Sequence, residues 1–416
     1  MLFAAALLAS AAAYPGAPPS RRRDLSWSSH YASTENDPAL PALPVWPLPA
    51  SGSFPSGSPG AACLTPFFSI SCAAGSACPD PLGAAFDRYS GYLSFAGAPV
   101  PLAAGAPAVT ALTVRVGGAA ALALRVSENY TLSLPSGVGN DTVAVLAADT
   151  QWGALRGLET FSQLFIWSGR GVPVSYCTAN AGLAVADWPR YPWRGLLIDS
   201  ARHFLPLSAI FVTLEAMAFV KLNTLHWHIV DDQSWPLFSE QYPNFTAGAY
   251  CADCIYTHED ISRVVDFAEA RGIRVIPEFD MPAHAAIWGK GYPALEITCP
   301  DGPSLLNPID DGSQWSTYTV VDNLLAEFGP LFRTVSSFNS APCAAHKTAR
   351  SRAPSRPPPP PPLPSSPIPA RSLSGRRGSL WRRRGGEPRL LERVRRRARL
   401  CRGKGAAHDG QSAQLL

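Results

Sequence analysis

The feature that most constrains the fold is a regular alternation of short apolar runs and amphipathic helical patterns between about residues 194 and 332. Three strand-like runs, at 194–200, 224–232 and 271–280, each end in polar residues. Helical patterns follow them at 207–219, 258–271 and 315–332, with apolar residues at three- and four-residue spacing. Because strands that alternate with helices form βαβ units, we predict an α/β fold built on a parallel sheet.

Charged and imidazole side chains gather where the three strand-like runs end. In chain order the groups are Asp199, Arg202 and His203; His226, His228, Asp231 and Asp232; and Glu278, Asp280 and His284. The carboxyl ends of parallel strands meet at one edge of a sheet, which is where a β/α barrel carries its active site. Burying so many polar groups together is costly without a function, so the pattern predicts a site for a polar ligand.

Several of these residues also have a purely structural explanation. Asp199 and Glu278 lie in apolar runs, where an internal salt bridge or a hydrogen bond to a backbone amide explains them as well as catalysis does. We expect His226 and His228, on either side of Trp227, to point to different faces, so that one of them is structural. Metal binding is conceivable for these residue types, but no HExxH or comparable spacing supports it, and we predict no metal and no cofactor.

A second, smaller domain is predicted at residues 45–166. Short β-branched or alternating runs between about 107 and 150 are separated by Gly, Asn and Ser, which is typical of antiparallel strands. The segment 152–165 has the apolar spacing of an amphipathic helix that packs on such a sheet. The segment is therefore interpreted as an α+β domain that precedes the βαβ units at 190–335.

The first thirteen residues form a short apolar run that ends in small residues, as a secretory signal peptide does. The run lacks the usual basic start, and an N-terminus buried in the fold is the alternative. Residues 14–44 have the Pro-, Ser- and Ala-rich composition of a linker or propeptide. No stretch is apolar over the ~20 residues that a membrane-spanning helix needs. We therefore expect a chain of the secretory pathway without a membrane span.

The cysteines and sequons agree with this prediction. The chain has 9 Cys residues, which in an oxidising compartment favours disulfides and leaves at least one thiol unpaired. N-glycosylation sequons begin at Asn129, Asn140 and Asn244. Cys251 and Cys254 have the CxxC spacing of metal and redox sites, but no second CxxC or His pair completes a zinc site, so either a loop disulfide between them or two separate bridges is favoured.

The charge distribution separates a tail from the rest of the chain. Residues 341–416 hold 18 of the 35 Lys and Arg residues but only 3 of the 31 Asp and Glu residues. This tail is rich in Pro and Arg and has no apolar periodicity, so we predict that it is disordered. Either it is a genuine basic tail, or it is out-of-frame or intron-derived translation joined to a truncated enzyme, which we favour. Nucleic-acid binding would rest on charge alone, because aromatics other than Trp381 are missing, and it is not predicted.

Three long strings then resemble one known family. YPWRGLLIDSARHFLP at 191–206, KLNTLHWHIVDDQSWP at 221–236 and PEFDMPAHAAIWGKGYP at 277–293 are similar to successive blocks of the family 20 glycoside hydrolases, the β-N-acetylhexosaminidases of eukaryotic type. The likeness covers about 45–335, because VWPLPASG and the segment up to Phe165 resemble the small N-terminal domain of these enzymes. The resemblance implies a (β/α)8 TIM barrel, here incomplete, behind an α+β domain. It also implies removal of terminal N-acetylglucosamine or N-acetylgalactosamine from glycans, in the secretory pathway, outside the cell or in a lysosome or vacuole.

The resemblance assigns roles to individual residues. Arg202 corresponds to an arginine that grips sugar hydroxyls, for which a forked guanidinium is suited. Asp231 and His284 correspond to an acid and a histidine that support the sugar and the catalytic Glu. Asp280 and Glu278 are supporting residues, and Trp288 and Trp235 are candidate pocket walls, with buried packing as the alternative for both.

The likeness stops before the chemical core of the family. Its mechanism is substrate-assisted and uses adjacent Asp and Glu in an HxGGDE block after the fourth strand. This sequence has no such string, and its only acids beyond Phe332 are Glu387, Glu392 and Asp409 in the basic tail. No catalytic residue is therefore assigned. An enzyme of which this chain is an incomplete version and a non-catalytic amino-sugar-binding remnant are both compatible with the sequence, and the family resemblance makes a homodimer conceivable.

Overall fold

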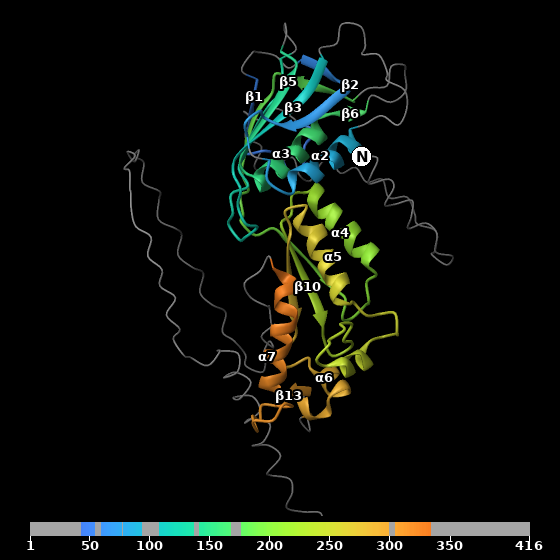
Figure 1. Ribbon diagram of the computed structural model, residues 1–416. Coiled ribbons are helices and arrows are strands. Elements are labelled where there is room, and N and C mark those ends of the chain that lie inside the picture. The colour runs from blue at the N-terminus through green and yellow to red at the C-terminus, as the bar shows by residue number, and fades with distance from the viewer. Residues whose placement is uncertain are drawn as a thin grey trace, which may run out of the picture. The chain divides into compact units, whose positions relative to one another are not determined.

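The computed structural model describes residues 43–54, 60–76, 78–93, 108–136, 141–167, 176–298 and 304–333 (Figure 1). The predicted signal peptide at 1–13, nearly all of the linker at 14–44, the sequon at Asn140 and the tail at 341–416 lie outside the described residues. Within them are two hydrophobic cores, one in the N-terminal sheet domain and one around a parallel sheet.

An eight-stranded sheet forms the first core. Its spatial order is β1-β8-β4-β5-β3-β2-β7-β6. The bounds of its strands are Ser51–Ser53 (β1), Gly60–Cys72 (β2), Ala108–Gly118 (β3), Tyr130–Ser133 (β4), Val143–Thr150 (β5), Ile166–Trp167 (β6), Tyr176–Ala181 (β7) and Ala184–Asp187 (β8). The predicted run of antiparallel strands is wrong in part, because β3 pairs in parallel with both β2 and β5. The sheet also extends beyond the expected end at residue 166, since β7 and β8 belong to it.

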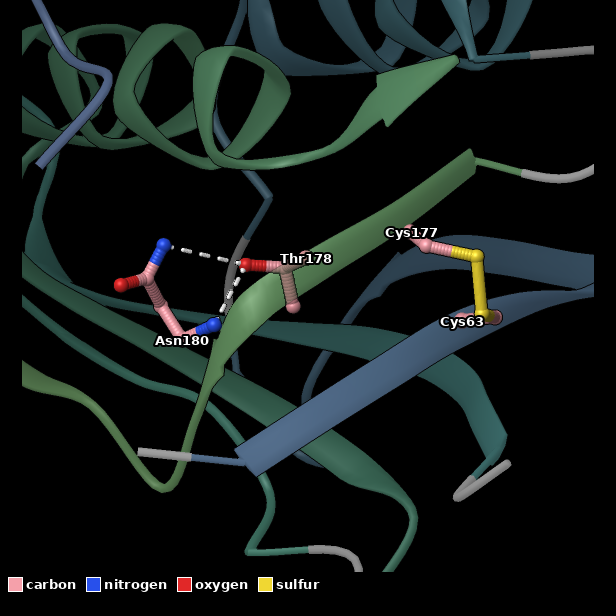
Figure 2. Close-up of a disulfide and its surroundings, with 4 residues drawn as sticks. All are labelled: Cys63, Cys177, Thr178 and Asn180. Carbon is pink, nitrogen blue, oxygen red and sulfur yellow. Dashed lines mark hydrogen bonds between the residues drawn. A yellow bond between two sulfur atoms is a disulfide. The ribbon is translucent and has the colours of Figure 1, made fainter. Parts of the chain in front are cut away.

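Two helices, α2 (Leu82–Tyr92) and α3 (Gln151–Leu164), cover one face of this sheet (Figure 1). Helix α3 confirms the helix predicted at 152–165, and the Thr150 hydroxyl caps it by accepting from the backbone amides of Trp152 and Gly153. Gly153 lets the helix approach the sheet domain closely, because a Cβ there would lie 2.4 Å from the carbonyl oxygen of Asn129. The neighbouring antiparallel strands β2 and β7 are joined by the Cys63–Cys177 disulfide (Figure 2).

The second core surrounds a parallel sheet of three strands in the order β11-β10-β9. These are Gly195–Asp199 (β9), Thr224–Val230 (β10) and Arg274–Phe279 (β11). They alternate with α4 (Leu207–Phe219), α5 (His258–Glu269) and α7 (Thr317–Phe328), so the predicted strand–helix alternation is confirmed. Thr257 and Asp260 form a capping box at the start of α5, and Ser316 caps α7.

Shorter elements complete the second core and were not predicted. They are α6 (Ala286–Gly291), the hairpin of β12 (Glu296–Thr298) with β13 (Ser304–Leu306), and the 3-10 helices at Pro243–Gly248, Pro293–Leu295 and Gly329–Phe332. Trp227, Trp235 and Trp288 are its largest fully buried side chains. No helix within the described ranges is long and apolar enough to span a lipid bilayer.

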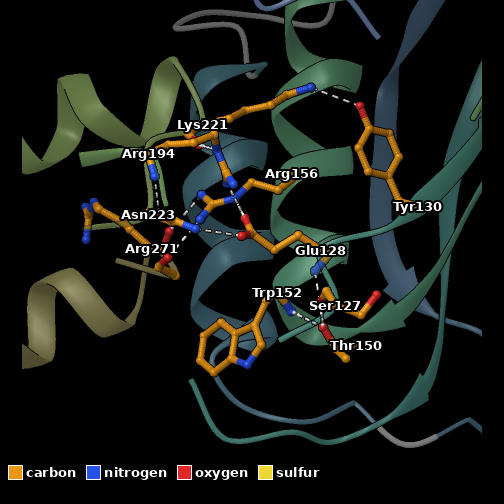
Figure 3. A network of polar contacts seen from close by, with 12 residues as sticks. Ser127, Glu128, Tyr130, Thr150, Trp152, Arg156, Arg194, Lys221, Asn223 and Arg271 are labelled. Atoms are coloured by element: carbon orange, nitrogen blue, oxygen red, sulfur yellow. Dashed lines mark hydrogen bonds and ion pairs between the residues drawn. The ribbon is translucent and has the colours of Figure 1, made fainter. Parts of the chain in front are cut away.

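A buried polar network joins the two cores (Figure 3). The carboxylate of Glu128 accepts from Arg156 Nε at 2.7 Å, from Arg194 Nη2 at 2.6 Å and from Asn223 Nδ2 at 2.8 Å. The guanidinium of Arg156 also donates to the carbonyls of Arg271 and Gly272, which precede β11. One carboxylate of the sheet domain therefore holds the chain at the amino ends of β9 and β10.

Candidate sugar-binding site

The site lies at the carboxyl ends of the three parallel strands, and Asp231 is its centre. One carboxylate oxygen, Oδ2, accepts from Arg202 Nη2 at 2.7 Å and pairs with His228 Nε2 at 2.8 Å. The other, Oδ1, accepts from the backbone amide of Asp232 at 2.6 Å and pairs with His284 Nδ1 at 3.1 Å. The structure therefore brings Arg202, Asp231 and His284 together at one carboxylate, as the sequence predicted.

Asp231 is fully buried, and its pKa is lowered. Burial alone would raise the pKa, but hydrogen bonds from His228 and the Asp232 amide, together with the positive charge of Arg202, outweigh it. The register of β10 against β11 shifts between His228 and Val230, and such a bulge re-aims the side chains that follow it. A carboxylate whose pKa is lowered, and which is therefore charged at neutral pH, thus lies at the end of the central strand.

Arg202 is held from two sides. Its Nη1 donates to Asp199 Oδ2 at 2.8 Å, while its backbone amide donates to Asp199 Oδ1 at 3.0 Å. The side chain remains 40% exposed. A guanidinium has five N–H donors, so this one keeps donors that face solvent after both carboxylates have been bound. The internal salt bridge expected as one explanation for Asp199 is present, and it orients the arginine.

His228 lies between two carboxylates. Its Nδ1 is 2.8 Å from Glu278 Oε2, and its Nε2 contacts Asp231. Burial alone would lower the pKa of His228, but the hydrogen bonds to Asp231 and Glu278 raise it to about 9. Glu278 responds in the opposite direction: burial would raise its pKa, but the hydrogen bonds from His226 and His228 lower it to about 2. His228 is therefore an imidazolium at neutral pH and donates through both nitrogens.

The expectation that His226 and His228 point to different faces is wrong. Both bind the same oxygen of Glu278, with His226 Nε2 at 2.6 Å. Residues two apart in a strand lie on one face, and it is Trp227 between them that points away, donating to Ser200 Oγ at 2.9 Å. Both histidines therefore belong to the site face of β10, and neither is the separate structural histidine that was expected.

Asp280 and His284 complete the group. Burial raises the pKa of Asp280 to about 6, and the negative charge of Asp231 adds to the effect, although His284 opposes it. His284 adopts φ 60, a left-handed conformation that few non-glycine residues take, and its side chain is 43% exposed. Backbone strain of this kind is tolerated where the surrounding structure fixes a side chain for a purpose.

The remaining predicted residues take other positions. Trp288 is only 1% exposed and packs edge-on against Trp235, so both belong to the core, which is the packing alternative. His203 is exposed, and Asp232 accepts from the Ala286 amide at 2.9 Å at the start of α6. Asn129 and Asn244 are both exposed, as a glycan would require.

Two groups of residues within the described ranges are close enough to ligate a metal ion. They are His228, Asp231 and Asp280, and Asp231, Asp232 and His284, with donor atoms within 4.8 Å of one another. In the first group both nitrogens of His228 already contact the carboxylates of Asp231 and Glu278, so the imidazole would have to give up one of these contacts to ligate a metal ion.

Comparison with known proteins agrees with this geometry. Residues 191–339 match the glycosyl hydrolase family 20 catalytic domain, and residues 45–164 match the domain described as beta-acetyl hexosaminidase like. Over residues 191–339 this chain belongs to glycosyl hydrolase family 20. It is 44% identical over 212 residues to beta-hexosaminidase subunit A1 of Dictyostelium discoideum, covering 51% of this chain and 38% of the relative. It is also 44% identical over 214 residues to beta-hexosaminidase subunit beta of Mus musculus, covering 50% of this chain and 37% of the relative.

Among solved structures, the Flavobacterium johnsoniae chitobiase is similar with a TM-score of 0.56 and 26% identity, over 72% of this chain and 44% of that one. The family 20 chain thus consists of an N-terminal α+β domain and part of a catalytic domain, and it spans well under half the length of the relatives it matches.

The structure confirms the prediction of disulfides, which are typical of chains that fold in an oxidising compartment. Cys63 pairs with Cys177, Cys72 with Cys78, and Cys251 with Cys254, so of the two alternatives left open for the CxxC segment the structure has the loop disulfide. Cys299, Cys343 and Cys401 lie outside the described residues.

Proposed function

We propose that residues 190–335 are the first part of the (β/α)8 barrel of a β-N-acetylhexosaminidase and carry its binding site for a terminal, non-reducing N-acetylhexosamine. The observation that carries the proposal is the convergence of Arg202 and His284 on the buried carboxylate of Asp231. The family match and three consecutive parallel strands in barrel order support it.

The hydrogen bonds indicate a separate role for each residue of the proposed site. Asp199 and Asp231 hold the guanidinium of Arg202 in one orientation, so its remaining donors can bind two sugar hydroxyls at little further entropic cost. Asp231 binds Nδ1 of His284, which leaves Nε2 of this half-exposed ring available to a sugar or to a neighbouring carboxylate. His228, Glu278 and His226 lie behind this first layer and keep Asp231 charged.

Hydrolysis needs groups that this sequence does not contain. In the family mechanism the substrate's acetamido oxygen attacks the anomeric carbon while an adjacent Asp and Glu orient the acetamido group and protonate the leaving oxygen. No Asp–Glu pair follows the third βα unit here. Retaining hydrolysis of N-acetylglucosamine or N-acetylgalactosamine conjugates is therefore proposed for a protein that includes the remaining barrel units, and sugar binding alone for the present chain.

Ligand-observed NMR titration of the purified chain with N-acetylglucosamine tests the proposal, with glucose as the comparison ligand. We expect N-acetylglucosamine to bind and Arg202→Ala to abolish binding. The matched control is Arg263→Ala, which removes an arginine whose side chain is 55% exposed on α5. Equal behaviour of the two variants would contradict the proposed site.

A second assay separates the enzyme from the binding remnant. A chromogenic N-acetylglucosaminide should not be hydrolysed by this chain. Turnover that disappears in Arg202→Ala would instead establish an enzyme whose acid the sequence does not reveal.

We further propose that the chain enters the secretory pathway, with the product extracellular, lysosomal or vacuolar. Three disulfides lie within the described residues, and Asn129 and Asn244 are exposed. A mobility shift after treatment with an N-glycan-removing amidase, lost when all three sequons are removed in Asn129→Gln/Asn140→Gln/Asn244→Gln, would test this. Relatives named as subunits alpha and beta support assembly into an oligomer, for which we propose a homodimer of a longer protein that contains this chain.

A further inference from the structure

Two tyrosine hydroxyls hold the loop that carries Arg202. This loop, residues 200–206, joins β9 to α4 without regular secondary structure. The hydroxyl of Tyr250 donates to the carbonyl oxygen of Arg202 at 2.8 Å, and the hydroxyl of Tyr256 donates to that of Leu205 at 2.5 Å. Tyr256 is buried and stacks on Phe204 at 4.9 Å, whereas Tyr250 is 51% exposed.

A disulfide lies between the two tyrosines. Cys251 and Cys254 close a tight turn with a Cα–Cα distance of 4.9 Å, and the amide of Cys254 donates to the carbonyl of Cys251 at 3.0 Å. On one side of the turn the Gly248 carbonyl accepts from the Trp235 amide, and on the other the Tyr256 amide donates to Pro236. Both ends of this segment are therefore fixed to the core, and the disulfide braces the exposed part that presents Tyr250.

We propose that Tyr250 and the Cys251–Cys254 disulfide form a redox-sensitive positioning element for Arg202. The proposal rests on the sugar-binding function proposed above, because Arg202 is the residue being positioned. Cys251 is exposed and Cys254 is partly exposed, so a small dithiol can reach the bond. Thiol–disulfide exchange then breaks the S–S bond: the dithiol supplies two electrons and two protons, is itself oxidised to a disulfide, and leaves two thiols on the chain.

The effect of breaking this bond is local. A disulfide that closes a longer loop constrains the unfolded chain more, and this one spans a sequence separation of only 3, so it contributes little to the stability of the fold. Without it the turn keeps its backbone hydrogen bond but is free to open, and the Tyr250 hydroxyl is no longer held against the loop. Arg202 then has the salt bridges to Asp199 and Asp231 but a mobile backbone, which weakens the site without unfolding it.

The test compares Tyr250→Phe and Cys251→Ser/Cys254→Ser with the unmodified chain. Cys72→Ser/Cys78→Ser is the matched control, since it removes another short-range disulfide, with a sequence separation of 6, from the sheet domain. Hydrogen exchange of the amides in 201–205 should accelerate in the first two variants and stay unchanged in the control. The Kd for N-acetylglucosamine should rise about three- to tenfold in the same two variants, as loss of one hydrogen bond implies.

The two readouts separate this inference from the proposed function. Unchanged exchange in 201–205 in both variants overturns the positioning role, whatever the sugar does. Faster exchange in a chain that does not bind N-acetylglucosamine supports the positioning role and rejects the sugar site. Treatment of the unmodified chain with a dithiol should reproduce the faster exchange of Cys251→Ser/Cys254→Ser, and failure to do so overturns the redox sensitivity.

Discussion

Replacing Glu128 with Ala should strongly destabilise the described fold. The carboxylate is 5% exposed and accepts hydrogen bonds from Arg156, Arg194 and Asn223, which belong to both cores (Figure 3). Without the Glu128 carboxylate, the buried guanidinium of Arg156 keeps only its hydrogen bonds to two backbone carbonyls. The guanidinium of Arg194 loses its counter-ion in this network. Breaking a buried ion pair from one side costs about 3–5 kcal/mol, a large fraction of the roughly 5–15 kcal/mol by which domains are stable.

Guanidinium chloride unfolding at pH 7, followed by tryptophan fluorescence, measures this loss. Glu240→Ala is the control, because its side chain is 75% exposed and its ion pair with His258 is 3.8 Å long. The control should change the free energy of unfolding by less than about 0.5 kcal/mol. A loss below about 1 kcal/mol in Glu128→Ala would refute the view that this carboxylate joins the two cores.

The pH dependence provides a second check on the same residue. Burial raises the pKa of Glu128, but the charges of Arg156 and Arg194 outweigh it, so the pKa is lowered from 4.5. A carboxylate whose pKa is lowered by folding stabilises the folded state fully above pH 4.5, its ordinary pKa. This stabilisation is lost as the pH falls below 4.5. The unmodified chain should therefore lose more stability than Glu128→Ala when the pH falls below 4.5. Parallel pH profiles would contradict this assignment.

Three further predictions concern the site and its support. Asp231→Asn should raise the Kd for N-acetylglucosamine about 10- to 100-fold by NMR titration, because charge-assisted bonds worth about 1.5–3 kcal/mol hold Arg202 and His228 in place. His228 has a pKa raised from 6.5 to about 9, so its charged form stabilises the fold fully below pH 6.5, and this stabilisation is lost as the pH rises to 9. The free energy of unfolding, measured at pH 6.5 and pH 9, should therefore fall by up to about 3 kcal/mol. This fall should be absent in His228→Asn. Gly272→Ala should lower the free energy of unfolding by about 1 kcal/mol or more, because Gly272 has φ +67 and a Cβ there would lie 3.1 Å from Arg156 Nη2. Gly83 has open space around it, so Gly83→Ala should not lower the free energy of unfolding in the same denaturant experiment.

The strand–helix alternation was sufficient to predict the second core. Each predicted strand and helix between 194 and 332 is present within a few residues, because hydrophobic periodicity reports burial directly and the helices carry recognisable caps at Thr257 and Ser316. Convergence of Arg202, Asp231 and His284 was also predictable, since parallel strands place their carboxyl ends at one edge.

The parts that escaped prediction depend on contacts distant in sequence. Strands β2 and β7 are paired across 114 residues at Cys63 and Cys177, and nothing near either cysteine indicates that partner. The parallel pairing of β3 with β5 was missed because alternation indicates a half-buried strand but not its direction. Tyr250 was missed because its role is a hydroxyl bond to a carbonyl oxygen 48 residues away, for which the sequence carries no signal.

The free edge of β9 leads to a last prediction, about association. Among the residues that the structure describes, β9 pairs with β10 on one side only, and Leu196 and Leu197, which point to opposite faces, are 41% and 51% exposed. A strand edge with apolar side chains on both faces is a template for pairing with another chain, and a charge placed there prevents such pairing. The chain made alone should therefore associate with increasing concentration, as sedimentation velocity would show, and Leu197→Lys should reduce the associated fraction. Val212→Lys, at a 50% exposed position on α4, is the control for a general effect of added charge. Equal suppression by both variants would mean that net charge, rather than the open edge of the parallel sheet, governs association.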